Sequence, residues 1–428
     1  NGDKDVYWYQ EVKRMEPVFK FQVMFEQSLG LREPWHVTKA LFNEQERAVH
    51  VYINGRKTAE YPCPECGKLC RRYDDEEDER VWRHADVVLY PCFIHSRRPR
   101  IACTEHGIRV VNAPWAKSPY AMSTVGREGY AMLLAQIMSL NEARRIVRIS
   151  RTAMLHIAKY WVEKAVREDD LSAVNQLSID ETSFKRGQSY VTVIGAPAQR
   201  RVIGVEDGRD VAAVERFSLD FGRRKGDCNK IKSVSMDMSK VYKAATTLCF
   251  PEATVVYDHF HVKKLMLDAM DTVRREEQGQ KMARSRSACK KLLMIPEHKM
   301  TVQQKERLQE LSREYPKLGR AFRMVKQLDD LYFCQTRPQA ESVLRRLTSW
   351  MMHSKLAPMK EAAASLRRNR EEILAYFEQR ISNAFAEGMN SLIQTAKRKA
   401  RGYHTFEGYR TAIFLAVGKL ALSYPQPW

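Results

Sequence analysis

Four residues near the start of the sequence have the types and spacing of a structural metal site. Cys63 and Cys66 form a C-x2-C pair, and Cys103 and His106 form a C-x2-H pair. The stretch "CPECG" carries the proline and glycine that a tight turn prefers. Two such pairs supply the four sulfur and nitrogen ligands of a tetrahedral zinc ion. We therefore expect a structural zinc site, the alternative being a reduced cluster without metal.

A third pair, Cys92 and His95, has the same C-x2-H spacing and competes for this role. Its context, "YPCFIHS", is typical of a β-strand, in which residues three apart point to opposite faces. We rank this pair second. Cys70 has no second ligand close to it in the sequence and is expected to be a packed thiol.

Three acidic residues are candidates for metal-dependent chemistry. Asp180 ends the apolar run "LSID", Asp237 ends "SVSMD", and Glu387 lies in the helical stretch "SNAFAEGMN". Three carboxylates can hold two divalent ions, which in phosphodiester chemistry activate the attacking oxygen and stabilise the leaving oxygen. Oxygen ligands favour Mg²⁺ or Mn²⁺. Each acid also has a plainer alternative: Asp237, for example, could cap the helix that starts near Ser239.

Polar residues beside these acids could support them. Asp258 and His261 lie just past a later strand in "VVYDHFHVKK", and Asn383 and Asn390 flank Glu387. We expect these four residues to orient the acids from a second layer, the alternative for Asp258 and His261 being a satisfied polar cluster. Four basic residues after Glu387 could hold phosphates or form a solvated helix face: Lys397, Arg398, Lys399 and Arg401.

The elements that would position these acids alternate between strand and helix over residues 174–258. Their order is β-β-β-α-β-α-β, with three antiparallel strands extended by parallel ones, which is the order of a ribonuclease-H-like fold. The first and fourth strands of that fold lie side by side, so Asp180 and Asp237 should meet. Residues 259–380 are rich in helix-forming residues and predict an all-α block. The helix carrying Glu387 would then close the site.

The segments before this core predict two smaller modules. Residues 34–53 alternate in the manner of a β-hairpin around "NEQE" and precede the cysteine-bearing stretch. Residues 126–168 predict three short helices, with Asn141 and Ser150 as N-caps of the second and third. A tight turn near Ser150 favours a helix-turn-helix over a plain helical connector. Its last helix would offer three side chains to a DNA groove: Arg151, Thr152 and His156.

The charge of the chain favours a polyanionic partner. Lys and Arg number 72 against 52 Asp and Glu, a formal charge of +20. Nucleic acid is the expected partner, the alternative being a merely basic enzyme or a ribosomal-type protein. The longest apolar stretches are too short to span a membrane, and we see no signal peptide. Nine cysteines, an odd number, indicate a reducing compartment, and we expect a cytoplasmic, nucleoid-associated protein.

Eight stretches together resemble the bacterial insertion-sequence transposases of the ISL-three family. The resemblance spans roughly residues 30–412 and is carried by "PWHVTKALF", "CPECG", "VWRHAD", "RPRIACTEHGIRVVNAPWA", "SIDETSFKRG", "MDMSKVYKAA", "VVYDHFHVKKLM" and "SNAFAEGMNSLIQTAKRKARGYHTF". It implies a zinc ribbon on Cys63, Cys66, Cys103 and His106, a helix-turn-helix, and a ribonuclease-H-like domain interrupted by an all-helical insertion. It also implies that Asp180, Asp237 and Glu387 form a DDE catalytic triad.

These inferences combine into an α/β multidomain protein whose parts we expect as follows: an N-terminal hairpin and zinc ribbon (1–120), a helix-turn-helix (121–170), the first part of the catalytic core (171–258), the insertion (259–380) and the last part of the core with basic helices (381–428). The expected function is metal-dependent cleavage and joining of double-stranded DNA, both element ends and target, by a homodimer. The alternatives are a catalytically silent DNA-binding regulator or domesticated transposase, and a nuclease that cuts without joining.

Two further side chains have expected roles, and one of them has an alternative. Glu181, next to Asp180, is expected to be a supporting acid that pairs with Lys185 or Arg186. Trp350, in "LTSWMMHS", could stack on a displaced base, but a buried core tryptophan is the favoured interpretation.

Overall fold

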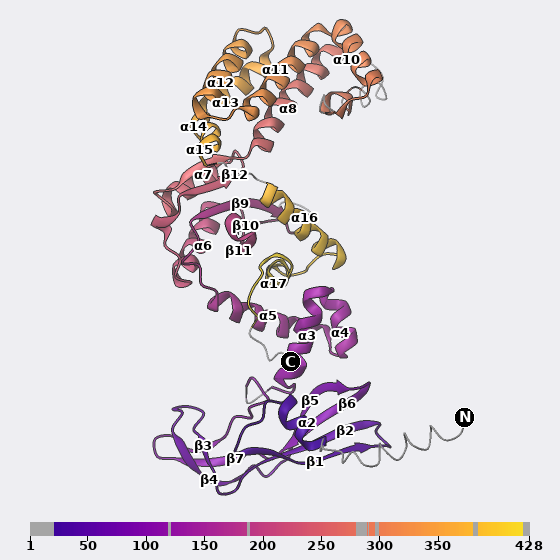
Figure 1. Ribbon diagram of the computed structural model, residues 1–428, viewed down its shortest axis with the longest axis vertical. Coiled ribbons are helices and arrows are strands. Elements are labelled where there is room, and N and C mark those ends of the chain that lie inside the picture. The colour runs from indigo at the N-terminus through magenta and orange to yellow at the C-terminus, as the bar shows by residue number, and fades with distance from the viewer. Residues whose placement is uncertain are drawn as a thin grey trace, which may run out of the picture. The chain divides into compact units, whose positions relative to one another are not determined.

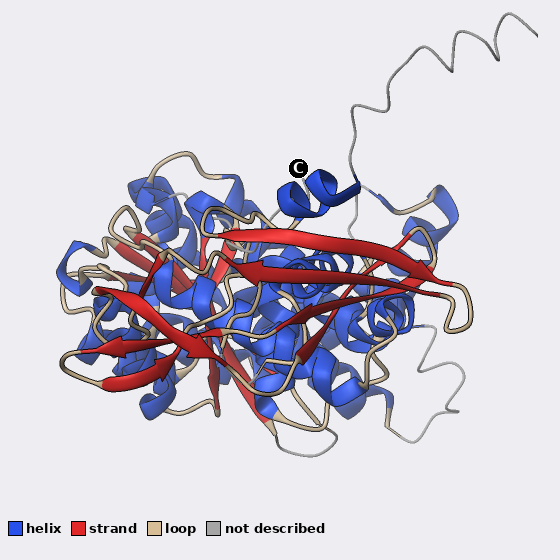
Figure 2. Ribbon diagram, turned by 90° about the horizontal axis from the view of Figure 1, so that it is seen from below, coloured by secondary structure: helices blue, strands red, loops and turns tan. Residues whose placement is uncertain are grey.

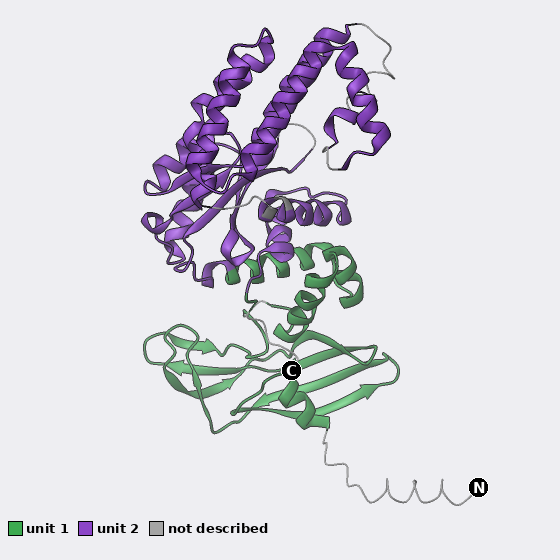
Figure 3. Cartoon of the chain, turned by 45° about the horizontal axis from the view of Figure 1, so that its top comes forward, with its two compact units in different colours: residues 1–165, 421–428 green, residues 166–420 purple. Residues whose placement is uncertain are grey.

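The computed structural model describes residues 21–118, 121–185, 189–279, 289, 291–295, 299–379 and 384–422. The chain divides into two units, residues 1–165 with 421–428 and residues 166–420 (Figure 3). Both units combine strands with helices (Figure 2). Among the helices of the described ranges, none is long and apolar enough to cross a membrane.

The first unit contains a four-stranded sheet built on a hairpin. Strand β1 (Trp35–Asn43) pairs antiparallel with β2 (Ala48–Gly55), which confirms the hairpin predicted around "NEQE". Strand β6 (Tyr90–Ser96) pairs in parallel with β2 and antiparallel with β5 (Arg80–Val87). Helix α2 (Phe21–Ser28) packs on β1 through the buried ring of Phe25.

A second, smaller sheet of this unit carries the cysteine pairs. Its strands, in spatial order, are β3 (Glu60–Pro62), β4 (Leu69–Asp75), β7 (Pro99–Cys103) and β8 (Gly107–Val110). Between β3 and β4, the amide of Gly67 donates to the carbonyl of Cys63 at 2.9 Å, and Gly67 has a φ of 73° that only glycine adopts easily. Gly107 repeats this conformation, with a φ of 68°, between β7 and β8. Tight turns therefore hold both pairs, as the sequence predicts.

Three helices follow, of which only the last three residues of the third lie in the second unit: α3 (Val125–Ile137), α4 (Leu140–Val147) and α5 (Arg151–Glu168). The predicted N-cap Asn141 is wrong, because Ser139 caps α4 and forms a reciprocal capping box with Glu142. The predicted cap Ser150 is confirmed, since its Oγ accepts from the amide of Ala153 at 3.1 Å. The buried guanidinium of Arg127 donates to the carbonyls at the end of α4 and so joins α3 to α4.

The second unit is built on a five-stranded sheet of order β11-β10-β9-β12-β13 (Figure 1). The strands are β9 (Gln176–Ser183), β10 (Tyr190–Ala196), β11 (Arg201–Asp207), β12 (Ser233–Met236) and β13 (Thr254–Tyr257), with α6 (Val211–Arg223) and α7 (Lys240–Cys249) as the connecting helices. β9, β10 and β11 are antiparallel, whereas β12 and β13 extend the sheet in parallel from β9. The predicted element order is thus confirmed.

One expectation and one alternative interpretation about this sheet are wrong. Asp180 does not end its strand, because β9 continues to Ser183 and pairs with β10 along that extension. Asp237 does not cap the following helix, because the Oγ of Ser239 accepts from the amide of Tyr242 and takes that role. The side chain of Asp237 is therefore available for another function.

Every described element between residues 259 and 379 is helical, as predicted. These helices are α8 (His259–Gln278), α10 (Val302–Glu314), α11 (Pro316–Phe333), α12 (Arg337–Met352), α13 (Ala357–Arg368), α14 (Arg370–Leu374) and α15 (Tyr376–Gln379). They share one apolar core with the sheet. The chain then returns through α16 (Ala384–Lys399), which lies beside β9, and α17 (Phe406–Val417) (Figure 1).

A glycine lets α16 come close to the sheet. A Cβ added at Gly195, on β10, would lie 2.5 Å from Cε1 of Phe385 on α16 and 2.6 Å from Oγ of Ser178 on β9. Real Cβ atoms do not approach other atoms so closely, so either the ring or the helix would have to move. Because Phe385 lies near the start of α16, Gly195 controls how that end of the helix packs.

We expect Gly195→Ala to lower the free energy of unfolding by roughly 1–3 kcal/mol, since overpacking forces side chains and backbone to shift. Gly222→Ala is the matched control, because a Cβ at that position on α6 would meet no heavy atom within 4 Å. Urea unfolding followed by circular dichroism measures both. Equal transition midpoints for the two variants would contradict the packing role of Gly195.

Candidate metal centres and active site

The structure brings together the four predicted zinc ligands. The ligand atoms of Cys63, Cys66, Cys103 and His106 all lie within 4.8 Å of one another. Nδ1 of His106 is 3.8 Å from Sγ of Cys63 and 3.6 Å from Sγ of Cys103, and the Sγ atoms of Cys66 and Cys103 are 3.8 Å apart. Tetrahedral ligands on bonds of about 2.0–2.3 Å are separated by roughly these distances. The residues therefore fit a zinc ion.

The surroundings of this cluster also fit a cation. The backbone amide of Glu105, followed by the ring of His106, lowers the pKa of Cys103 to about 6, so the metal-binding thiolate is favoured near neutral pH. Nε2 of His106 lies 3.6 Å from a carboxylate oxygen of Glu65, the kind of partner that fixes the ring of a metal-bound histidine. The sequence interpretation missed Glu65, although it stands inside the "CPEC" turn.

The competing pair does not join this cluster. Nε2 of His95 lies 2.9 Å from Nδ1 of His50, and its Nδ1 lies 2.9 Å from Glu79. Burial raises the pKa of Cys92 to about 12, which keeps that thiol protonated. Cys92 and His95 thus lie on β6, apart from the four residues of the cluster.

Three carboxylates end up at one edge of the second unit's sheet. Ile179 pairs with Met236 across β9 and β12, and Met236 pairs with Tyr257 across β12 and β13. The residue that follows each of these three paired positions is an acid: Asp180 within β9, and Asp237 and Asp258 directly after β12 and β13. Strand register alone therefore sets the three acids side by side.

The close approach of these acids affects the pKa of Asp180. Burial, followed by the charge of Asp237, raises the pKa of Asp180 to about 7. Nε2 of His261 lies 2.8 Å from Oδ1 of Asp237, and this contact raises the pKa of His261. One ligand atom each from Asp237, Asp258 and His261 falls within 4.8 Å of the others. The three carboxylates at this edge carry more negative charge than His261 can neutralise, so the edge fits a divalent cation.

Asp258 has a structural role as well. Its Oδ1 accepts from the amide of Phe260 at 3.1 Å and so caps α8. Oδ2 of the same carboxylate lies 3.9 Å from Nε2 of His261. Two interpretations were offered for Asp258 and His261. Oδ1 of Asp258 fits the satisfied polar cluster, and Oδ2 fits the expected support for the acids.

Helix α16 is fastened to β9 by three side chains on one face. Nδ2 of Asn390 donates to Oδ2 of Asp180 at 2.5 Å, and Nε2 of Gln394 donates to Oγ1 of Thr182 at 2.6 Å. Nζ of Lys397 donates to the carbonyl of Ser183 at 2.6 Å. The ammonium of Lys397, for which the sequence left phosphate binding and a solvated helix face open, is thus engaged with β9. Gln394 was missed because its partner is remote in the chain.

Glu387 lies on α16, three residues before Asn390. Its side chain falls outside the described residues, and so does Asn383 altogether. Spacings of three, seven and ten residues separate Glu387 from Asn390, Gln394 and Lys397. Positions with these spacings share one face of an α-helix.

The neighbouring acid, Glu181, is held elsewhere. Its Oε1 lies 3.8 Å from Nη1 of Arg209, so the predicted pairing with Lys185 is wrong. The ammonium of Lys185 lies instead over the ring of Phe184, and Arg186 is outside the described residues. Asp180 and Glu181 therefore face different partners.

The other predicted DNA-contacting residues are accessible. Arg151, Thr152 and His156 are exposed on the first two turns of α5, and Arg398, Lys399 and Arg401 are exposed at and just past the end of α16. A cavity of about 930 Å³ adjoins the acidic edge at His261. Its lining includes basic residues that the sequence interpretation missed, since they come from α7, α8 and α13: Lys240, Lys243, Lys264 and Arg368.

Comparison with known proteins agrees with this geometry. Residues 177–413, more than half of the chain, match the transposase model of the ISL3 (ISL-three) family. The chain belongs to the ISL3 family of transposases. Residues 59–106 also match the zinc-finger model of the transposases of IS204, IS1001, IS1096 and IS1165. The zinc-ribbon match covers all four residues of the cysteine and histidine cluster.

Two relatives show how far the family likeness extends. The transposase of insertion sequence IS1001 from Bordetella parapertussis is 26% identical over 391 residues, which cover 89% of this chain and 95% of that protein. The transposase of IS1557 from Mycobacterium tuberculosis (strain ATCC 25618 / H37Rv) is 25% identical over 370 residues, covering 80% of this chain and 82% of that protein. The similarity thus includes both units.

We expect the purified chain to carry one zinc ion that Cys66→Ser removes, because loss of one thiolate opens the tetrahedral site. Cys70→Ser is the control, since Cys70 lies on the nearby strand β4 but outside the group of four. Elemental analysis of the dialysed proteins measures the difference. Full zinc retention in Cys66→Ser, or equal loss in both variants, would contradict the ligand assignment.

The raised pKa of Asp180 predicts a pH-dependent stability when divalent cations are removed. A carboxyl group whose pKa is raised by folding stabilises the fold at low pH, and that contribution disappears as the pH rises to about 7. Asp180→Asn should therefore unfold at a higher temperature than the wild type at about pH 8, with the difference shrinking toward about pH 6. Thermal unfolding in a chelator measures it; a difference independent of pH would contradict the burial of this charge.

Proposed function

We propose that this transposase binds the ends of its insertion sequence and performs metal-dependent DNA cleavage and strand transfer with Asp180, Asp237 and Glu387 as a DDE triad. The observation that carries the proposal is the convergence of Asp180, Asp237 and Asp258 at one sheet edge, to which Asn390 fastens α16. The sheet order, three antiparallel strands followed by two parallel ones, supports a ribonuclease-H-like core.

The acids of the proposed triad, Asp180, Asp237 and Glu387, would hold Mg²⁺ or Mn²⁺. Such ions, when bound, activate the attacking oxygen and stabilise the leaving oxygen of the phosphodiester. The remaining work belongs to the chain. Asn390 holds one oxygen of Asp180 in place, and His261 holds one oxygen of Asp237. Fixed carboxylates need no reorganisation when phosphate arrives, which is how a preorganised site lowers a barrier.

The first unit would supply DNA recognition. The three helices α3, α4 and α5, with a left-handed residue at Arg148 that ends α4, support a helix-turn-helix whose exposed residues Arg151, Thr152 and His156 contact the groove. The zinc ribbon would hold its two β-turns around one zinc ion. A homodimer follows from the reaction, since two element ends must be joined to one target. The basic cavity beside His261 would bind the phosphates of the strand that enters the site.

The reaction would proceed in two steps at the same residues. Water attacks the phosphodiester at the element end and releases a 3′-hydroxyl, which then attacks a phosphodiester of the target. Each attack forms one phosphorus–oxygen bond and breaks another, and no covalent bond between protein and DNA is required.

Asp180→Asn should reduce both cleavage and strand transfer by at least about a thousandfold, because several kcal/mol of transition-state stabilisation depend on the cation site. Glu181→Gln is the matched control at the adjacent position, whose carboxylate faces Arg209. The assay incubates each protein with intact or precleaved element ends, plasmid target and Mg²⁺, and quantifies both cleaved and joined products.

The same assay separates the alternatives. A wild type that binds ends without cutting or joining them would be a silent regulator, and one that cuts without joining would be a nuclease. Strand transfer that survives Asp180→Asn, or that falls equally in Glu181→Gln, would overturn the assignment of Asp180.

A further inference from the structure

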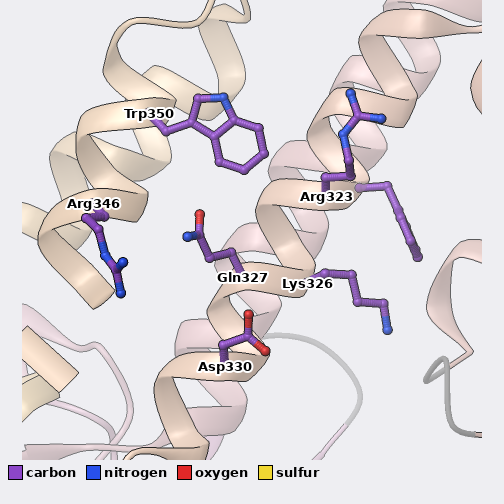
Figure 4. Close-up of a pocket in the computed structure, with 7 residues that line it drawn as sticks. Arg323, Lys326, Gln327, Asp330, Arg346 and Trp350 are labelled. Atoms are coloured by element: carbon purple, nitrogen blue, oxygen red, sulfur yellow. The ribbon is translucent and has the colours of Figure 1, made fainter. Parts of the chain in front are cut away.

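Apolar side chains lie in water beside basic groups in both units of the chain. Trp350, on α12, is 37% exposed, so the favoured sequence interpretation, a buried core residue, is wrong. It borders a cavity between α11 and α12 together with Arg323 and Arg346 (Figure 4). Val88 and Leu89, at the turn between β5 and β6 of the first unit, are 85% and 74% exposed, far more than the indole. This turn is therefore the more unusual of the two places.

The conformation of the turn makes its apolar side chains unexpected. Val87 pairs with Tyr90, so the turn consists of Val88 and Leu89 alone. Val88 has a φ of 58°, in the left-handed region that a β-branched residue rarely adopts. Glycine, asparagine or aspartate is usual at such a position of a two-residue hairpin turn. The chain thus keeps valine against both its conformational preference and its hydrophobicity, and strain of this kind is concentrated at functional sites.

The tip of this hairpin, Val88 and Leu89, is not covered by the helices beside it. A cavity of about 230 Å³ is lined by residues of the turn, of α3 and of α4. Its lining includes Tyr130 of α3 and Ile146 of α4, both exposed, and Arg148 just after α4. The tip and these side chains therefore belong to one continuous surface of the first unit.

Positive charge dominates around the tip. Asp86 is the only acid that lines the cavity, and its carboxylate binds Arg83 through one oxygen and lies 3.7 Å from Nη1 of Arg148 through the other. Arg145, on the last turn of α4, is exposed as well. Helix α5 begins with the exposed Arg151, three residues after Arg148. The tip therefore adjoins the surface from which the proposed recognition helix would reach DNA.

The size of this apolar surface separates protein from DNA as its partner. A stable protein interface buries roughly 800 Å² and about 20–30 residues on each partner. The tip with Tyr130 and Ile146 offers four such residues. A DNA duplex needs fewer, because apolar side chains inserted between neighbouring base pairs from the minor groove unstack and kink it while basic residues hold the adjacent phosphates. An exposed pair of aliphatic side chains flanked by arginines therefore fits a duplex.

We propose that the tip is a wedge: Leu89, with Val88 beside it, inserts between two base pairs in the minor groove of the duplex that the first unit binds, while Arg145 and Arg148 hold the flanking phosphates. This inference rests on the proposed function, in that it takes double-stranded DNA as the ligand of the first unit. A turn of only two residues keeps the wedge narrow enough for a groove about 6 Å wide. Insertion would kink the duplex by roughly 20–90°.

The experiment measures base unstacking by the full-length chain without divalent cation, so that binding occurs without cleavage. Each duplex carries the terminal sequence of the element, with 2-aminopurine in place of one adenine at successive positions. Stacking quenches the fluorescence of 2-aminopurine, so we expect the bound wild type to raise it severalfold at one base step and to leave distant positions unchanged. Fluorescence anisotropy of an end label measures binding of the same duplexes.

Matched variants assign the unstacking to the tip. Leu89→Ser and Val88→Asn should each remove most of the fluorescence increase, whereas Leu69→Ser, at a leucine that is 67% exposed on β4, should keep it. Asparagine tolerates the left-handed region, so Val88→Asn should unfold at the same temperature as the wild type or at a higher one. A purely structural role of Val88 predicts the opposite, a lower thermal stability with an unchanged fluorescence increase.

A bound wild type that brightens no position, or an increase that survives both Leu89→Ser and Val88→Asn, would overturn the wedge. Equal loss of the increase in Leu69→Ser would do the same. A dimer that Leu89→Ser dissociates in sedimentation, with fluorescence unchanged, would assign the tip to a second copy of the chain instead. Failure of the wild type to bind the duplexes would overturn the proposed DNA recognition as well, whereas intact binding without unstacking would overturn the wedge alone.

Discussion

The second unit depends on holding three carboxylates at one edge of a sheet. Parallel pairing of β9, β12 and β13 places Asp180, Asp237 and Asp258 next to one another, and their mutual repulsion opposes the fold that creates the arrangement. The chain reduces this repulsion with three devices. His261 lies against Asp237, and the backbone amide of Phe260 in the first turn of α8 donates to Asp258. The pKa of Asp180 rises to about 7. A divalent cation would replace the proton on Asp180 and relieve the remainder.

This constraint explains where the helical insertion leaves and rejoins the core. Helix α8 starts directly after Asp258, so its first turn carries His261 to the acids. At the other end, α14 packs against β13, and Glu372 of α14 pairs with Lys243 of α7. Both ends of the insertion therefore meet the sheet beside the same edge. The chain can then continue into α16, whose contacts with β9 join residues more than 200 positions apart in the sequence, such as Asp180 and Asn390.

Features that depend on interactions between nearby residues could be predicted from the sequence, whereas features that depend on remote segments could not. The zinc quartet was accessible because each pair is set by a local turn, and the strand order because apolar runs and turns mark each element. The register of the strands could not be predicted. Only the structure shows that β9 continues to Ser183 and that Asp258 lies level with Asp237. Gln394, the engagement of Lys397 and the exposure of Trp350 were missed for the same reason. Each depends on which remote segment faces the residue, and helical periodicity does not specify that.

The net charge of the chain is positive, whereas the charge at the acidic edge of the second unit's sheet is negative. A formal charge of +20 attracts DNA from a distance, yet a phosphate that arrives at the edge of β9, β12 and β13 meets carboxylates. Lys240, Lys264 and Arg368 line the adjoining cavity and can hold flanking phosphates, but they do not neutralise the acids themselves. Under the proposed mechanism, the scissile phosphate would therefore approach the acids only with cations bound between them. In the proposed mechanism basic residues would select the polymer, and the acidic edge would make the reaction conditional on the metal.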